Sequence, residues 1–412
     1  MPRNAHFQPD REPLHHPNLQ LRQSHISGPF SFLNPTSAGY VPTPQHPDQA
    51  RPTAQPKHIE HLWRSRDNRK GRHALKVDYR VPHSGPTPRP TSEFKAAIRG
   101  ILRMVTCVPY WDVSYLVAIM FTLGSMVWII NGFFVWLPLE DPRSEFPGEP
   151  LVGGGVSAFI GASIFEIGSV LLLLEAINAN QTACFGWAVE MELEKADASV
   201  ATMVKPNKED CTHHHANRKN LVGAGGSRPE HSREANDGTS LRGKSFRWMP
   251  SLMELRTHYL RELGFLASLV QFIAATIFWI AGFTGLPGII DHLSQSVENG
   301  VYWVPQIVGG SGFIVSGLLF TLETQRKWYI PAWHVLGWHV GFWNFIGGIG
   351  FTLCGALGPA TTDSGVEYQA TLATFWGSWA FMIGSTIQWY ESLEKYPVER
   401  ARGGNVQTNH KG

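Results

Sequence analysis

The chain is poor in cysteine and lacks the short motifs of the common enzyme classes. Its 412 residues include four cysteines, and the topology predicted below places none of them in an external loop. We therefore expect no disulfide framework. The sequence contains no nucleophile–base motif, phosphate-cradling glycine loop or dinucleotide fingerprint. These absences predict a protein that is not an enzyme, with no cofactor, no metal site and no nucleic-acid partner.

The first hundred residues also lack the apolar core of a secretory signal peptide. Insertion into a membrane would then depend on the first membrane helix. A tract of possible metal ligands, Asp210 to His215, has no second ligand cluster beside it. We expect it to lie in a disordered loop and to bind no metal specifically.

Long apolar segments are what the chain has in abundance. Each has about 20 or more residues, which is the length needed to cross a hydrocarbon core of about 30 Å. The predicted spans are roughly 114–137, 155–177, 264–286, 304–323, 333–357 and 369–390. Several of the 15 tryptophans lie near the predicted ends of these spans, as is typical of membrane interfaces. The bilayer is therefore the first expected partner.

One motif occurs in three of these spans with identical spacing. It combines a glycine, a phenylalanine four residues later, a Gly-Ser or Ser-Gly pair and a glutamate fourteen residues after the first glycine. At 100° per residue these positions share one stripe of a helix, where small residues allow close helix packing. The predicted packing residues are Gly161, Phe165, Gly168, Gly309, Phe313, Gly317, Gly377, Phe381 and Gly384.

The intervening helices carry a matching stripe of small and aromatic residues and end in proline. Its members are Gly124, Trp128 and Gly132; Ala274, Phe278 and Gly282; and Gly347, Phe351 and Gly355. The repeated unit is therefore a two-helix hairpin, used three times in the same orientation.

The motif glutamates Glu175, Glu323 and Glu391 lie about 21 Å beyond the first glycine by helical rise, at the predicted cytosolic interface. They either form an acidic ring at a cytosolic mouth or cap helices and pair with local bases such as Arg326, Lys327 or Lys395. We favour the structural role.

Three polar residues lie deeper in the predicted spans. Glu166 is near mid-bilayer, Asn344 occupies a similar depth in the fifth span, and His339 is one to two turns nearer the cytosol. A buried acid in lipid is costly unless it is paired or faces water. Together they are a candidate polar pathway for cations or protons. The alternative is a protonated Glu166 that holds neighbouring helices in register.

The placement of lysine and arginine predicts the orientation. Twelve lie between Lys195 and Arg261, whereas the predicted external loops 139–153, 288–303 and 358–368 contain only Arg143 against eight acids. Both termini should face the cytosol, in the plasma membrane or an endomembrane. Residues 92–103 predict a basic amphipathic helix. It either lies on anionic lipids, which we favour, or packs as a short helix on the bundle. Ser251 and Glu254 predict a capping box ahead of the third span.

The signature F-x-x-G-S occurs as Phe165–Ser169 and Phe381–Ser385, with an altered middle copy at Ser316-Gly317. In this respect the spans resemble the YrhK-like family of small two-helix membrane modules. With its polar tails, the chain is similar to integral membrane proteins of filamentous fungi. The resemblance covers the spans and implies a membrane location, but it supplies no activity.

The predicted fold is an all-α membrane protein with six transmembrane helices in three tandem hairpins and disordered cytosolic tails. It acts either as a transporter or channel for small solutes or ions, or as a non-transporting scaffold or sensor whose tails recruit partners. The predicted parts are a disordered tail (1–90), a basic juxtamembrane helix (92–110), hairpins at 114–177, 264–323 and 333–391, a largely disordered loop (178–262) and a C-terminal tail (392–412).

Overall fold

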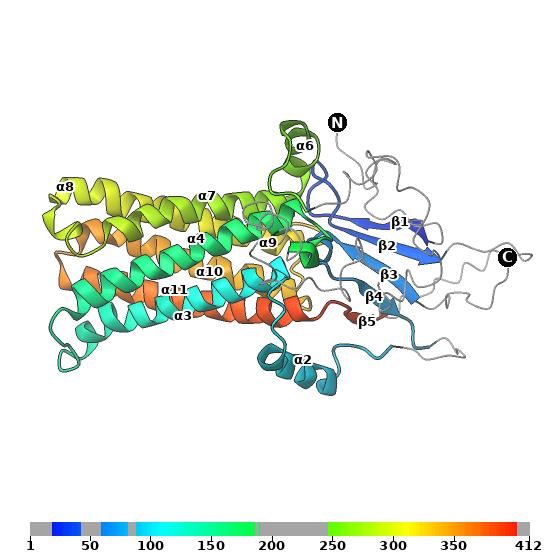
Figure 1. The fold of residues 1–412 in the computed structure, drawn as a ribbon, viewed down its shortest axis with the longest axis horizontal. Coiled ribbons are helices and arrows are strands. Elements are labelled where there is room, and N and C mark those ends of the chain that lie inside the picture. The colour runs from blue at the N-terminus through cyan, green and yellow to red at the C-terminus, as the bar shows by residue number, and fades with distance from the viewer. Residues whose placement is uncertain (1–18, 43–58, 81–87, 186–188, 190–245, 402–412) are drawn as a thin grey trace, which may run out of the picture.

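The computed structural model describes residues 19–42, 59–80, 88–185, 189 and 246–401. Long helices run side by side in one part of the molecule, and a small sheet lies beyond one end of them (Figure 1). The helices are α3 (Val113–Glu140), α4 (Gly155–Ile177), α7 (Leu263–Thr284), α9 (Val304–Glu323), α10 (Leu336–Leu357) and α11 (Ser364–Leu393). Each contacts the next in chain order and α11 also contacts α3, so the helices close into a ring. We call the end nearest the strands the sheet end.

Five helices in the described part of the chain are long and apolar enough to cross a membrane, which indicates an integral membrane protein. They are α3, α7, α10 and the two stretches Glu149–Ile177 and Gln295–Glu323, which extend α4 and α9. The sequence predicts six spans. Helix α11 has 30 residues, but polar side chains such as Gln388 and Glu391 make it less apolar than the others.

Glycines of the repeated motif lie where helices approach most closely. A Cβ atom on Gly317 would stand 2.5 Å from the backbone nitrogen of Phe345 in α10. A Cβ atom on Gly309 would stand 2.6 Å from the Cβ atom of Phe278 in α7. Only a residue without a side chain allows backbones to pack at these distances.

A five-stranded sheet forms from both ends of the chain. Its strands are β1 (Leu19–Ser27), β2 (Ser37–Pro42), β3 (Ile59–Arg64), β4 (Ala74–Val77) and β5 (Val398–Arg400), in that order across the sheet. The first four are antiparallel neighbours, and β5 pairs with β4 in parallel. The prediction of an all-α fold with disordered tails at 1–90 and 392–412 is therefore wrong for these stretches. The strands are stable because side chains such as Tyr40 and Val77 are fully buried.

Two other predicted features agree with the structure. Helix α2 (Phe94–Thr106) lies within the predicted juxtamembrane helix, and α6 (Leu252–Thr257) begins with the predicted capping box of Ser251 and Glu254. Most of the predicted disordered loop, including the tract from Asp210 to His215, lies outside the described residues.

Candidate functional site

The three motif glutamates lie together at the sheet end of the ring and are buried. Glu175, Glu323 and Glu391 are 0%, 3% and 1% exposed. An ionised carboxylate cannot be buried without several kcal/mol of cost unless a cation and hydrogen bonds compensate it. Each of these glutamates therefore needs a basic partner.

The partners come from α1 (Ser65–Arg69) and the residue that follows it. Arg66 donates two hydrogen bonds to Glu391, at 3.1 Å from Nε and 2.7 Å from Nη2. Arg69 Nη2 donates to Glu323 Oε2 at 2.8 Å. Lys70 Nζ lies 3.4 Å from Glu175 Oε1. Each repeat glutamate therefore meets at least one base of this segment.

The sheet delivers this basic segment to the ring. Strands β3 and β4 are paired as far as Leu62 and Ala74, and the connection between them carries α1. Arg64 holds this hairpin to β5 through hydrogen bonds of 2.6 and 2.9 Å to Glu399. The basic segment is therefore held by β3 and β4 on either side of it and by β5 from the C-terminal part of the chain. We call residues 65–72 the basic plug.

Charges within and around the basic plug balance. Arg72 Nη1 lies 2.5 Å from Asp67 Oδ1 and 2.9 Å from Glu391 Oε1, so it links the plug internally and to the ring. Four cations face four carboxylates in this cluster: Arg66, Arg69, Lys70 and Arg72 against Asp67, Glu175, Glu323 and Glu391.

The ring provides space for the plug at repeat-equivalent glycines. A Cβ atom on Gly337 would stand 2.3 Å from Arg66 Nε, and one on Gly264 would stand 2.7 Å from Arg69 Nη1. The spacing that relates Gly124, Ala274 and Gly347 also relates Ser114, Gly264 and Gly337. Two of the three repeats thus use glycine where an arginine of the plug enters.

Lys70 and Glu175 form the loosest of the three pairs. Neither Lys70 Nζ nor either carboxylate oxygen of Glu175 makes a hydrogen bond within the described residues. Burial is the largest influence on Lys70 and lowers its pKa to about 8, while the charge of Glu175 opposes this shift. Burial also acts to lower the pKa of Arg66, but the charge and hydrogen bonds of Glu391 outweigh it, so the pKa of Arg66 is raised.

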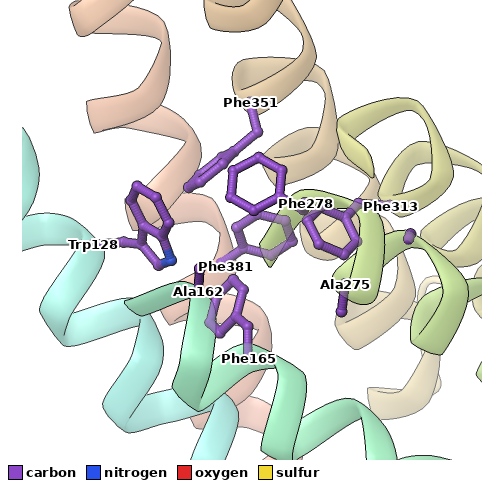
Figure 2. Close-up of a cluster of buried hydrophobic side chains, with 9 residues drawn as sticks. Trp128, Ala162, Phe165, Ala275, Phe278, Phe313, Phe351 and Phe381 are labelled. Atoms are coloured by element: carbon purple, nitrogen blue, oxygen red, sulfur yellow. The ribbon is translucent and has the colours of Figure 1, made fainter. Parts of the chain in front are cut away.

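An aromatic layer closes the centre of the ring further from the sheet. Each long helix contributes one ring to it, and Figure 2 shows these side chains converging. The centroids of Trp128 and Phe351 lie 4.9 Å apart, and those of Phe278 and Phe313 lie 5.5 Å apart. Rings at these distances are in contact and leave no room for a hydrated path between them. The layer consists of Trp128, Phe165, Phe278, Phe313, Phe351 and Phe381.

A small chamber remains between the aromatic layer and the basic plug. The space that the centre of a water molecule can occupy there is about 30 Å³. Arg66, Arg69 and Lys70 line it at the sheet end. The amides of Gln271, Asn344 and Gln388 also line it.

The structure places the three residues of the predicted polar pathway in different surroundings. Asn344 lines the chamber, but Glu166 and His339 do not. Glu166 accepts hydrogen bonds from Thr276 at 3.0 Å and from Ser169 at 3.3 Å, and Thr276 is exposed on the outside of the ring. The ring of His339 is 2.7 Å from the carbonyl oxygen of Trp333, before α10 begins. These three residues do not line one path.

The motif spacing predicts the three glutamates at one level, as observed, but the bases suggested for them in the sequence analysis are not their partners. None of the described bases Arg326, Lys327 and Lys395 forms an ion pair with them; Lys395 pairs with Asp112 at 2.5 Å. A usable signal was present in the sequence. Arg66, Arg69 and Lys70 have the spacing i, i+3 and i+4, which puts three bases on one helical face.

Comparisons with protein-family models, with curated proteins and with solved structures found no match to this chain.

Proposed function

We propose that this protein is a six-span integral membrane scaffold that holds a cytosolic sheet in a fixed position against the bilayer. The buried contact between the basic plug and the three repeat glutamates carries this proposal. Removing one partner of a buried ion pair costs about 3–5 kcal/mol, because the other charge is left buried and uncompensated. The three pairs therefore tie the plug to one position on the ring.

Helix α11 serves as the sixth span. It contacts both α10 and α3 and completes the ring, so a membrane around the other five helices also surrounds it. Its polar residues Gln388 and Glu391 are buried, which removes them from lipid. Both termini then face the cytosol together with the sheet, in agreement with the basic residues between Lys195 and Arg261.

Exposed apolar side chains support this placement of the bilayer. They occur just before α3, α7 and α10: Phe94 and Val105 are each 79% exposed in α2, Leu252 is 80% exposed in α6, and Trp333 is 74% exposed. Figure 1 shows α2 and α6 beside the sheet end of the ring. Apolar side chains on all three approaches fit a membrane interface, and Lys95 and Arg99 of α2 fit anionic lipids there.

The closed aromatic layer favours the scaffold over a transporter. Transport of a small solute or ion is the second candidate, because a polar chamber lies inside the ring at Asn344. That function requires both the aromatic layer and the basic plug to open. The resemblance to YrhK-like modules is compatible with either function and supplies no activity.

Distance measurements between spin labels test the scaffold. Cysteines for labelling at Gln20 in β1 and at Arg326 beyond α9 are exposed positions on the sheet and on the ring. The wild-type chain in nanodiscs should give one narrow distance distribution. Arg66→Glu should broaden it, and Arg66→Glu combined with Glu391→Arg should narrow it again because the pair is restored. A narrow distribution in the single variant would contradict the scaffold.

Flux measurements on the same preparations separate the two functions. The scaffold predicts that wild-type protein in vesicles gives no uptake of small cations, anions or protons above that of empty vesicles. Uptake that disappears in Asn344→Leu would establish transport instead.

A further inference from the structure

The chamber between the aromatic layer and the basic plug is built from equivalent positions of the three repeats. Phe121, Gln271 and Asn344 are related by the spacing of the odd helices. Leu172, Phe320 and Gln388 are related by the spacing of the even helices, and all six positions line the chamber. In each of these two sets at least one repeat has an apolar residue, namely Phe121 in the first set and Leu172 and Phe320 in the second. The other members are the three amides. Packing alone does not require polar groups at these sites.

These amides have no hydrogen-bond partner among the residues that the structure describes. Gln271 and Gln388 are 9% and 5% exposed, and neither they nor Asn344 make a side-chain hydrogen bond to any described residue. A buried amide without a hydrogen bond costs about 1–3 kcal/mol. We therefore expect the chamber to contain a species that these amides bind. The space open to the centre of a water-sized sphere, about 30 Å³, is enough for a water molecule or a small ion.

The charges around the chamber favour an anion. Arg66, Arg69 and Lys70 line it, whereas Glu175, Glu323 and Glu391 do not. The cations thus lie between the chamber and the carboxylates that neutralise them. A cation in the chamber would meet the positive groups first, whereas an anion would meet the N–H donors of guanidinium, ammonium and amide groups.

We infer that the chamber is a binding site for one small monovalent anion of halide size, held by the amides of Gln271, Asn344 and Gln388 above the basic plug. The site is independent of whether the protein acts as a scaffold or a transporter. The space open to the centre of a water-sized sphere there, about 30 Å³, is enough for an ion of halide size.

Thermal unfolding of the full chain in detergent tests this site. Sodium gluconate is replaced stepwise by sodium chloride or sodium bromide at constant ionic strength, so that nonspecific screening stays the same. The expected result is a saturable rise in Tm with chloride and with bromide, because an anion bound only to the folded state stabilises it. A chamber filled with water alone would give no saturable rise and would overturn the inference.

Variants locate the effect. Gln271→Leu and Gln388→Leu should each weaken the apparent chloride affinity at least tenfold. Gln306→Leu removes a buried amide of α9 that does not line the chamber and should leave the chloride affinity unchanged. Equal chloride responses in wild type, Gln271→Leu and Gln388→Leu would place the anion elsewhere and overturn the site.

A direct measurement covers the case in which the leucine variants fail to fold. Crystals of the wild-type chain in bromide, at concentrations that saturate the thermal shift, should show an anomalous peak between Gln271, Asn344 and Gln388. Absence of a peak at that position would contradict the inference.

Discussion

The guanidinium group of Arg66 and the carboxylate of Glu391 form two hydrogen bonds although the residues are 325 positions apart in the chain. Both side chains are almost completely buried, at 6% and 1% exposure. Arg66 belongs to the connection between two strands, and Glu391 belongs to the last turn of α11. This pair therefore joins the sheet to the ring of helices and closes the fold from both ends of the sequence.

Loss of this pair should destabilise the protein strongly. Glu391→Ala leaves the guanidinium of Arg66 buried without its bidentate partner, which should lower the free energy of unfolding by about 3–5 kcal/mol. Denaturant unfolding in detergent measures this change. Glu145→Gln alters an exposed acid and should change the free energy of unfolding by less than about 0.5 kcal/mol. Equal effects of the two substitutions would show that the buried pair does not stabilise the fold.

Enlarging Gly337 should also disturb the plug. A Cβ atom there would stand 2.3 Å from Arg66 Nε, so Gly337→Ala forces the arginine or the helix to move and should cost about 1–3 kcal/mol. Gly300→Ala is the matched control, because no atom lies within 4 Å of a Cβ atom at that position. The melting temperatures of the two variants should differ. If Gly337→Ala unfolds at the wild-type temperature, the contact is looser than the structure indicates.

Lys70 should make stability depend on alkaline pH. Its pKa is lowered from 10.5 to about 8 by burial, so between these values the unfolded chain binds more protons than the folded chain. Stability should therefore rise as the pH increases from about 8 to about 10.5, by an amount on the order of 2–3 kcal/mol. Denaturant unfolding at several pH values measures this rise.

The control for this pH effect removes the whole pair. Lys70→Met combined with Glu175→Gln replaces both charged groups and leaves no uncompensated charge. Subtracting its pH profile from that of the wild type removes contributions from tyrosines and other bases. A difference that is flat between pH 8 and 10.5 would mean that Lys70 is not held in a desolvated site.

The parts of this fold that sequence reasoning found are those whose signals are local. Phe165, Phe313 and Phe381 share a helical stripe with their glycines, and that spacing is enough to predict that they pack together inside the ring. The partners of Glu175, Glu323 and Glu391 have no local signal in the helices themselves. They lie in a five-residue helix and the residue after it, between short strands. The proline and histidine content of this region resembles that of a disordered tail.

The sheet was missed for a related physical reason. Strand β5 has three residues and β4 has four, so neither shows a recognisable alternation of apolar and polar residues. Their stability comes from pairing with distant strands and from burial at the end of the ring. Such pairing is a property of the assembled fold, as the 325-residue separation of Arg66 and Glu391 also illustrates.

The aromatic layer should be a main source of stability for the ring. Phe351 is fully buried, and Phe351→Ala should lower the free energy of unfolding by about 3–5 kcal/mol because a cavity replaces its ring contacts. Leu353 lies two residues away on the same helix, but its side chain is 43% exposed. Leu353→Ala should therefore lower the free energy of unfolding much less. Thermal unfolding in detergent compares the two. A smaller loss for Phe351→Ala than for Leu353→Ala would show that the layer is not tightly packed.

Helix α2 should bind anionic membranes through Lys95 and Arg99. They lie on the same short helix as Phe94, whose side chain is 79% exposed. Arg103, the third base of this helix, is already paired with Glu394. Each basic residue near an anionic surface contributes about 1 kcal/mol, so Lys95→Gln combined with Arg99→Gln should weaken the contact by about 2 kcal/mol.

A spin label at Ile98 reports the contact, because its accessibility to a polar relaxation agent falls when the helix enters the interface. In nanodiscs with anionic lipid the wild-type label should be protected, and in the double variant it should be accessible. Nanodiscs of neutral lipid should abolish the difference between the two chains, since the apolar face of α2 is the same in both. Equal protection in anionic lipid would mean that α2 is held by the protein alone, and the exposed side chains of Phe94 and Val105 would then need a different partner.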